Sequence, residues 1–379
     1  MKILLVGEYS RLHNSLKEGL EHFNYNVTIV ALNDGFKNYA VDLPILKKYE
    51  NGPLKKIKNL IYRFTKIDLE SLQIKKQIIT LKPKISNFDI VQFINESSFG
   101  CSPHIEKDIF NLISNWNKKV FLLSCGIDYI SLKYAHNNML RYSYLDPFLN
   151  GKEQLSPSYG FKFLQSDFKK LHQHIYKSIV GVIASDLDYH LPLLNHPKYL
   201  GLIPNPINTE QLEFKPLKID SKIVIFHGIN SHNYYKKGND IFEKALAIIN
   251  QKYADKIKIV TVRSLPYNEY IKSYNEAHIM LDQIYAYDQG FNALEAMSKG
   301  KVVFTGAEKE WLEYYNIKED TIAINALPDA KSIANKLEWL ILNPKKITEI
   351  SIQARRFVET HHNYKTCAEN YLKTWQKHI

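Results

Sequence analysis

The fold class is decided by the stretch Asp288-Gln289-Gly290-Phe291-Asn292-Ala293-Leu294-Glu295-Ala296-Met297, followed by Gly300-Lys301-Val302-Val303. It places an acid and a glycine turn before a helix, and a short β-rich run after it. Backbone N–H groups at a helix start lack internal partners and sit at the positive end of the helix dipole, so they bind anions and polar ligands. We expect Asp288 and Glu295 to line one pocket, suited to the hydroxyls of a sugar or ribose. An ordinary loop–helix–strand unit of an α/β domain is the alternative.

Short β-rich runs alternate with amphipathic segments along the chain, which is typical of α/β layers around parallel sheets. The Pro204-Asn205-Pro206 break and the polar segment Lys215–Ser221 separate two series. The sequence therefore predicts two doubly wound, Rossmann-like domains facing a central cleft, with ligands beyond the carboxyl ends of the strands. We expect the domains over residues 1–208 and 209–352, and a C-terminal helix over 353–379 that crosses back to the first domain. Strands are expected at Lys2–Val6, Asn26–Ala31, Ile90–Ile94, Val120–Ser124, Ile179–Ala184, Ile223–Phe226, Ile257–Val262, Ile279–Leu281, Val302–Thr305 and Ile322–Ile324.

Composition narrows the class of protein. The 379 residues are 45% hydrophobic and 23% charged, as in ordinary globular proteins. The first residues read as a buried strand that turns polar too soon for a secretory signal, and no apolar run approaches the about 20 residues of a membrane span. Three widely spaced cysteines show no metal-ligand pattern. We expect a cytoplasmic protein with reduced thiols and no metal site.

A basic segment covers residues 41–84. It holds eleven Lys and Arg against four Asp and Glu, a net charge of +7 within a chain of net charge +11. Leu54, Ile57, Leu60, Ile61 and Phe64 recur there at helical spacing. Such a helix can pack its apolar face on its own domain, or it can lie on an anionic membrane surface. Nucleic acid is not expected as a partner, since no recognition module is present.

Three motifs in the second half occur in the order of a known family. They are Ile203-Pro204-Asn205-Pro206-Ile207-Asn208, then Phe226-His227-Gly228-Ile229-Asn230 with Lys236-Lys237-Gly238-Asn239-Asp240, and then the stretch from Asp288 to Met297. In these motifs the chain resembles the retaining GT-B glycosyltransferases, particularly glycosyltransferase family 4. The resemblance covers residues 200–310 well and the first half only as a compatible α/β pattern.

The resemblance implies a nucleotide-sugar donor site in the second domain. Lys237 or Lys236 would contact the donor diphosphate, and Gly228 would allow close backbone approach. Asp288 and the backbone around Gly290, Phe291 and Asn292 would hold the donor sugar, and Glu295 the ribose. A nucleoside diphosphate leaving group can be stabilised by such cations and helix amides without a metal. No cofactor is implied besides the UDP- or GDP-sugar substrate, and the sequence does not distinguish the two bases.

The chain also departs from the family pattern. Tyr287 stands where the family has a glutamate, so Asp288 is expected as a shifted substitute. The arginine after the glycine turn is missing, which leaves Asn230, His232 or Arg263 to serve instead. The first-domain histidine is missing as well, and Asp128 is the ionisable residue in its region. Asp128 would orient the acceptor hydroxyl or accept its proton, or would simply cap the following helix.

Residues after the first-domain strands are expected on the acceptor side. Gly7 and Glu8 follow the first strand and would approach donor phosphates or acceptor, and Glu96 follows a later one. The resemblance implies a metal-independent, retaining glycosyltransferase, and we expect it to use a saccharide or lipid-linked acceptor in surface polysaccharide or glycoconjugate synthesis. A non-catalytic sugar-nucleotide-binding or assembly protein, or a sugar-nucleotide epimerase on the same fold, is the alternative.

Overall fold

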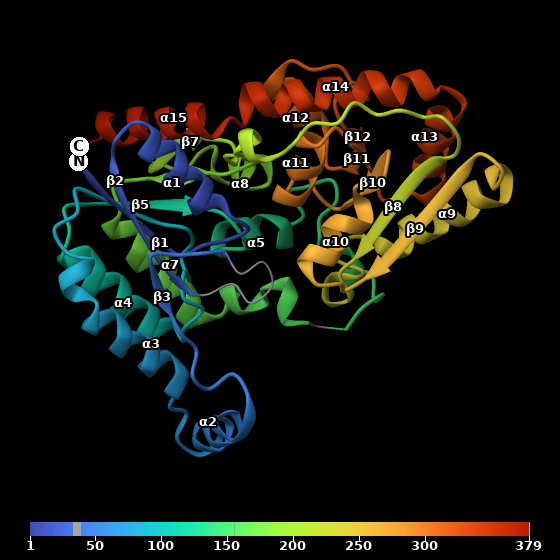
Figure 1. Ribbon diagram of the computed structural model, residues 1–379. Helices are drawn as coiled ribbons and strands as arrows, with labels where there is room; N and C mark the ends of the chain where they lie inside the picture. Colours follow the sequence, from blue (N-terminus) through green and yellow to red (C-terminus); the bar gives the residue numbers. More distant parts are fainter. Residues whose placement is uncertain (33–38, 155, 379) are drawn as a thin grey trace.

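The computed structural model describes residues 1–32, 39–154 and 156–378. Two parallel sheets lie side by side (Figure 1). The first has the order β3-β2-β1-β4-β5-β6-β7 and the second the order β12-β11-β10-β8-β9. We call each sheet with its helices the first and the second domain. The fold-class prediction is confirmed: the chain is α/β, with two doubly wound parallel sheets. The strands are β1 (Lys2–Val6), β2 (Asn26–Leu32), β3 (Leu43–Ile45), β4 (Ile90–Phe93), β5 (Lys119–Ser124), β6 (Val182–Ala184), β7 (Tyr199–Leu202), β8 (Ile223–Ile229), β9 (Ile257–Arg263), β10 (Ile279–Leu281), β11 (Val302–Thr305) and β12 (Ile324–Asn325).

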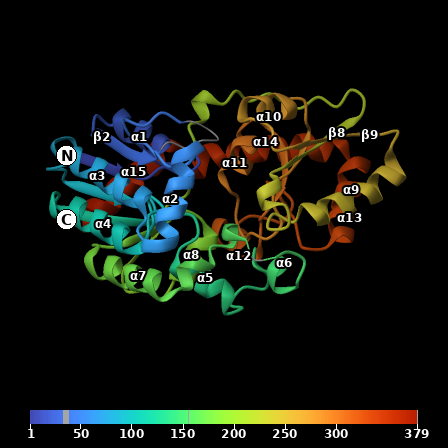
Figure 2. The same cartoon turned by 90° about the horizontal axis from the view of Figure 1, so that it is seen from below.

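Helices cover both faces of each sheet (Figures 1 and 2). No helix in the described ranges is both long and apolar enough to cross a bilayer. The helices are α1 (Leu12–His22), α2 (Gly52–Thr65), α3 (Leu69–Thr80), α4 (Pro103–Asn115), α5 (Tyr129–His136), α6 (Asp146–Leu149), α7 (Ser166–Ser178), α8 (Leu187–Leu193), α9 (Asn239–Tyr253), α10 (Tyr267–Tyr274), α11 (Phe291–Ser298), α12 (Lys309–Tyr315), α13 (Ala330–Leu342), α14 (Pro344–His361) and α15 (Tyr364–Lys377).

The core of the first domain follows from the two-residue period of its strands. In β1, Leu4 and Val6 belong to one apolar cluster while Ile3 and Leu5 belong to the cluster on the opposite face. All four are fully buried, as expected for a parallel sheet covered on both sides. Two strands were not expected from the sequence, β3 and β7. Both are short edge strands, and β3 contains Pro44, which only an edge position tolerates.

The two ends of the chain lie together at the outer end of the first domain (Figures 1 and 2). The chain leaves α14, which packs on α11 of the second domain, and enters α15, which packs on α1 of the first. Cys367, Tyr371 and Trp375 of α15 are buried in the same cluster as β1. At the crossing, Ile207 N–H donates to the His362 carbonyl over 2.7 Å, and Tyr364 N–H donates to the Ile207 carbonyl over 3.2 Å.

The structure of α2 excludes one of the two interpretations given for the basic segment. Packing of its apolar face on its own domain is wrong, because none of its fourteen residues is buried. Phe64 is 77% exposed and Leu60 58%. The helix protrudes from the first domain below α3 (Figure 1).

Candidate functional site

Three cavities lie where the carboxyl ends of the strands of the two sheets approach each other. We call them the second-domain cavity (about 520 Å³), the interdomain chamber (about 470 Å³) and the first-domain cavity (about 400 Å³). Each has a volume in the usual range for small-molecule sites. Ser10, Lys237, Gln283 and Gly290 line both of the first two, so these two spaces adjoin.

Two short stretches of sequence supply much of the wall of the second-domain cavity. Gly228 lies near the end of β8 and Asn230 directly after it, and Gly290, Phe291 and Asn292 lie at the start of α11. Helix α11 begins at Phe291, and its N-cap Gly290 provides no side-chain cap, so its positive end opens on the cavity. At Gly228 a Cβ atom would lie 2.4 Å from the Tyr270 ring, so only glycine fits beside this wall of the cavity.

Lys237 is the cation of the second-domain cavity. Its ammonium group lies 3.2 Å from Oδ1 of Asp282, a carboxylate that is 3% exposed. Asn292 Nδ2 donates to the same oxygen over 2.9 Å and to the Tyr270 hydroxyl over 3.1 Å. The lysine side chain keeps 31% of its surface exposed. The buried acid therefore fixes an accessible ammonium group in front of the start of α11.

Lys236 has a different position from its neighbour. Its ammonium group donates to the Ser158 carbonyl of the first domain over 2.6 Å and lies 4.9 Å from the centre of the Tyr144 ring. Burial, with the charge of Lys237 beside it, lowers the pKa of Lys236 to about 8. Lys236 thus connects the two domains at the edge of the chamber, while Lys237 lines both the chamber and the second-domain cavity.

A pair of acids joins the domains on the other side of the chamber. Asp288 accepts hydrogen bonds from Leu187 N–H at 2.9 Å and Gln289 N–H at 2.7 Å. In return, Asp188 accepts from Tyr287 N–H at 3.0 Å and Asp288 N–H at 3.3 Å. Burial raises the pKa of Asp288 to about 6 and, with Asp288 nearby, the pKa of Asp188 to about 7. We call this arrangement the carboxylate clasp.

Asp186 and Asp188 line the chamber and were not singled out in the sequence. Burial, together with Asp188 and Asp288, raises the pKa of Asp186, and its Oδ1 atom has no hydrogen-bond partner among the described residues. The available signal was their place directly after β6, at the carboxyl edge of the sheet, where ligands of such folds bind.

Several predicted donor residues lie away from the second-domain cavity. Glu295 lines a neighbouring cavity of about 120 Å³ with Phe291 and Arg11, and Asp288 is not among the residues that line it. Arg263 is half exposed and pairs with Glu243. Tyr287, at the family's glutamate position, is buried in the domain contact, where its hydroxyl accepts from Arg141 N–H at 2.8 Å.

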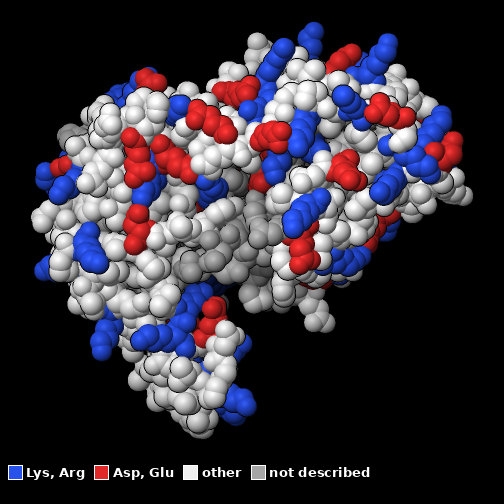
Figure 3. Space-filling view, viewed as in Figure 1, with Lys and Arg blue, Asp and Glu red and all other residues white. Residues whose placement is uncertain are grey.

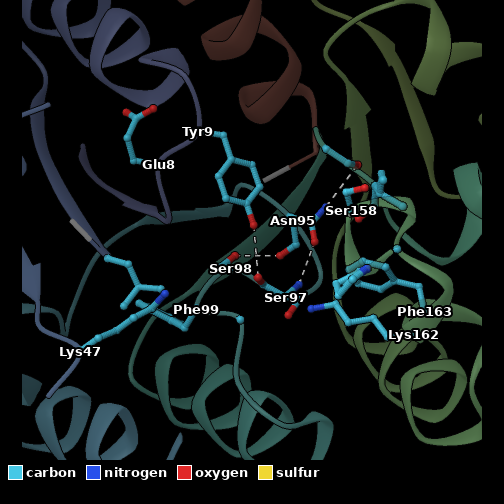
Figure 4. Close-up of a pocket in the computed structure, with 16 residues that line it drawn as sticks. Glu8, Tyr9, Lys47, Asn95, Ser97, Ser98, Phe99, Ser158, Lys162 and Phe163 are labelled. Atoms are coloured by element: carbon cyan, nitrogen blue, oxygen red, sulfur yellow. Dashed lines mark hydrogen bonds between the residues drawn. The ribbon is translucent and has the colours of Figure 1, made fainter. Parts of the chain in front are cut away.

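Some of the predicted first-domain residues line a cavity and others do not. Glu8 lines the first-domain cavity with Asn95, Lys47 and Lys162 (Figure 4). Its Oε2 atom accepts from the backbone and side chain of Asn14, both at 2.8 Å, and burial raises the pKa of Glu8 to about 7. Gly7 has φ of +88° and supports the turn that places Glu8 there.

Asp128 and Glu96 have internal partners instead. Asp128 accepts from Ser131 N–H at 2.7 Å and Ser124 Oγ at 2.5 Å and forms a capping box with Ser131 at the start of α5. Glu96 pairs with His172 Nδ1 at 2.6 Å, and burial raises the pKa of Glu96. Neither residue lines the three cavities. Among residues 1–32, 39–154 and 156–378, no cluster of His, Cys, Asp and Glu could hold a metal ion.

Comparison with known proteins supports the fold. Residues 233–373 match a family model described as glycosyl transferase-like, and no curated protein sequence matches the chain. Similar solved structures include a sucrose-phosphate synthase from Thermosynechococcus elongatus, with a TM-score of 0.64 and 15% identity over 100% of this chain and 98% of that one. TarM of S. aureus has a TM-score of 0.60 and 11% identity over 98% of each chain. Anabaena HepE in complex with UDP and glucose has a TM-score of 0.59 and 12% identity over 100% of each chain. The chain therefore has the GT-B glycosyltransferase fold, and its residues 233–373 match a glycosyl transferase-like family model.

Proposed function

We propose that the protein transfers a sugar from a nucleotide-sugar to a hydroxyl group of a saccharide or lipid-linked acceptor, with retention at the anomeric carbon. The observation that carries this proposal is the meeting of Lys237 and the start of α11 on one cavity at the carboxyl ends of β8 and β10. A cation and a helix start together suit a diphosphate. The match to the glycosyl transferase-like model covers the same residues.

We assign the donor sugar and the acceptor to the interdomain chamber and the first-domain cavity. The donor sugar would extend from the second-domain cavity into the interdomain chamber, and the acceptor would enter from the first-domain cavity beside Glu8. Lys237 and the α11 backbone would stabilise the charge that develops on the leaving diphosphate, without a cofactor. The chamber between the domains would keep water from the oxocarbenium-like transition state.

UDP-sugars are the first donors to test, because the similar HepE structures contain UDP with glucose, or UDP-glucose. We place the reaction in the cytoplasm, in surface polysaccharide or glycoconjugate synthesis. A lipid-linked acceptor would require the protein to work at the inner face of the cell membrane.

The proposal is tested by screening UDP- and GDP-sugars for thermal stabilisation of the protein and for release of the nucleoside diphosphate. A ligand at a hundred times its dissociation constant adds about 2.7 kcal/mol to the free energy of unfolding. Lys237→Ala should lower donor affinity roughly 10- to 100-fold, since it removes a charge-assisted contact. Lys244→Ala, on the exposed side of α9, is the matched control. Stabilisation without turnover for every acceptor would favour a non-catalytic binding protein, and no stabilisation would contradict the proposal.

A further inference from the structure

Helix α2 exposes a row of large apolar side chains. Leu54, Ile57, Leu60 and Phe64 lie three or four residues apart, and each exposes 47% or more of its surface. The next helix, α3, buries Ile74 and Ile78 in the core of the first domain. Apolar surface in water is unfavourable, and a contiguous row of this kind marks an interaction site.

The contacts of α2 leave most of this row uncovered. An ion pair between Lys58 and Glu70, at 2.5 Å, connects the helix to α3, and Ile61 is half-buried. Ile61 lies between Leu54 and Ile57 on the helix surface, so one position of the apolar face is half-buried while the four residues of the row stay exposed. In the space-filling view α2 forms a separate lobe below the first domain, with blue Lys and Arg side chains around it (Figure 3).

The charges around the row are positive, and apart from Lys58 they form no ion pair among the described residues. Lys55, Lys56, Arg63 and Lys66 have no acidic partner among the described residues, and α2 contains no Asp or Glu. Exposed apolar side chains continue on both sides of the helix: nine of the sixteen large ones among the described residues lie between Leu46 and Ile79. The surface thus combines apolar side chains with free cations over one protruding element.

We propose that α2 docks the protein on an anionic bilayer, with its apolar row entering the headgroup region and the surrounding cations contacting lipid phosphates. A bilayer surface accepts a row of apolar side chains flanked by cations and needs no matching groove, which suits an isolated convex helix. An acidic protein partner would have to cover the row with a shaped apolar surface. The docking does not depend on the proposed reaction.

The test is co-sedimentation of the full chain with phosphatidylcholine vesicles that contain or lack phosphatidylglycerol. We expect binding to the anionic vesicles, little to the neutral ones, and weaker binding at high salt. Leu60→Ser with Phe64→Ser, and separately Lys55→Glu with Lys56→Glu, should each lower vesicle affinity at least about tenfold. Because no residue of α2 is buried, these variants should keep the melting temperature of the wild type.

Matched controls lie on the second domain. Leu342→Ser removes an apolar side chain with 54% exposure, and Lys331→Glu with Lys345→Glu reverses two exposed lysines that form no ion pair among the described residues. Both controls should bind vesicles as the wild type does. Equal binding to neutral and anionic vesicles, or unchanged binding of both α2 variants, would overturn the proposal. The proposal would also be overturned if the protein bound no vesicles and instead formed a concentration-dependent dimer that Phe64→Ser abolishes. The α2 variants should leave donor stabilisation in the screen above unchanged, so the two proposals can fail separately.

Discussion

The two walls of the cleft are built in different ways. Two short stretches, Gly228 to Lys237 and Gly290 to Asn292, supply much of the second-domain wall. The first-domain wall gathers Glu8, Asn95 and Asp186 from the ends of three strands. A wall made of contiguous residues can be read as a motif, whereas a wall gathered by the sheet exists only after folding. The two walls also present different groups: the second-domain wall presents the ammonium group of Lys237 and the start of α11, and the first-domain wall presents the carboxyl groups of Glu8 and Asp186. Each wall can therefore be tested alone.

The largest effect is expected from Gly228→Ala in the second-domain wall. The added methyl group would lie 2.4 Å from Tyr270 and force that ring to move, at a cost of about 1–3 kcal/mol in the free energy of unfolding and with loss of ligand stabilisation. Gly290→Ala is the control, because its nearest neighbour would lie 3.7 Å away. Equal loss of stability in both variants, measured by denaturant unfolding, would mean that close approach does not shape this wall.

In the first-domain wall, Glu8 makes stability depend on pH. Its pKa is raised to about 7, so the folded protein holds this proton more tightly than the unfolded chain. Its contribution is therefore favourable at low pH, and stability falls as pH rises from about 4.5 to 7. Compared with the wild type, Glu8→Gln should gain roughly 2 kcal/mol between pH 5 and pH 8. Parallel pH profiles of unfolding for the two proteins would contradict this assignment.

The carboxylate clasp links the two walls. Asp288→Ala leaves Leu187 N–H and Gln289 N–H without their acceptor, so the free energy of unfolding should fall by about 1–2 kcal/mol. Donor affinity should fall as well, because the domains lose a contact that holds the chamber closed. Asp329→Ala, which removes the cap of α13 far from the cleft, should lower stability without changing donor affinity. A loss of stability alone in Asp288→Ala would make the clasp purely structural.

The smallest effect is expected at Arg263. The side chain is 51% exposed and pairs with Glu243 outside the cavity. Arg263→Ala should change the free energy of unfolding by no more than about 0.5 kcal/mol and leave donor affinity within twofold. A tenfold loss of affinity would show that this arginine reaches the donor after all, as the sequence allowed.

Most strands could be predicted from the sequence because buried parallel strands are continuous apolar runs. The exceptions, β3 and β7, are edge strands, and β3 carries a proline. Lys237, Gly228 and Gly290 could be found because the motif itself folds into the wall. The sequence could not show which acids line a cavity and which have internal partners. Glu8 and Glu96 both follow strands, yet Glu96 meets His172 from α7, 76 residues away, and no local pattern shows that contact. The same holds for Asp186 and Asp188, which meet Asp288 a hundred residues later.

The return of the chain to its starting domain has a mechanical consequence. The polypeptide passes between the domains at two adjacent places, and the strands of this double connection are held together by backbone hydrogen bonds of Ile207 with His362 and Tyr364. Sliding or twisting one domain over the other would break those bonds, whereas rotation about them would not. Rotation about this double connection is therefore the domain motion that leaves its hydrogen bonds intact.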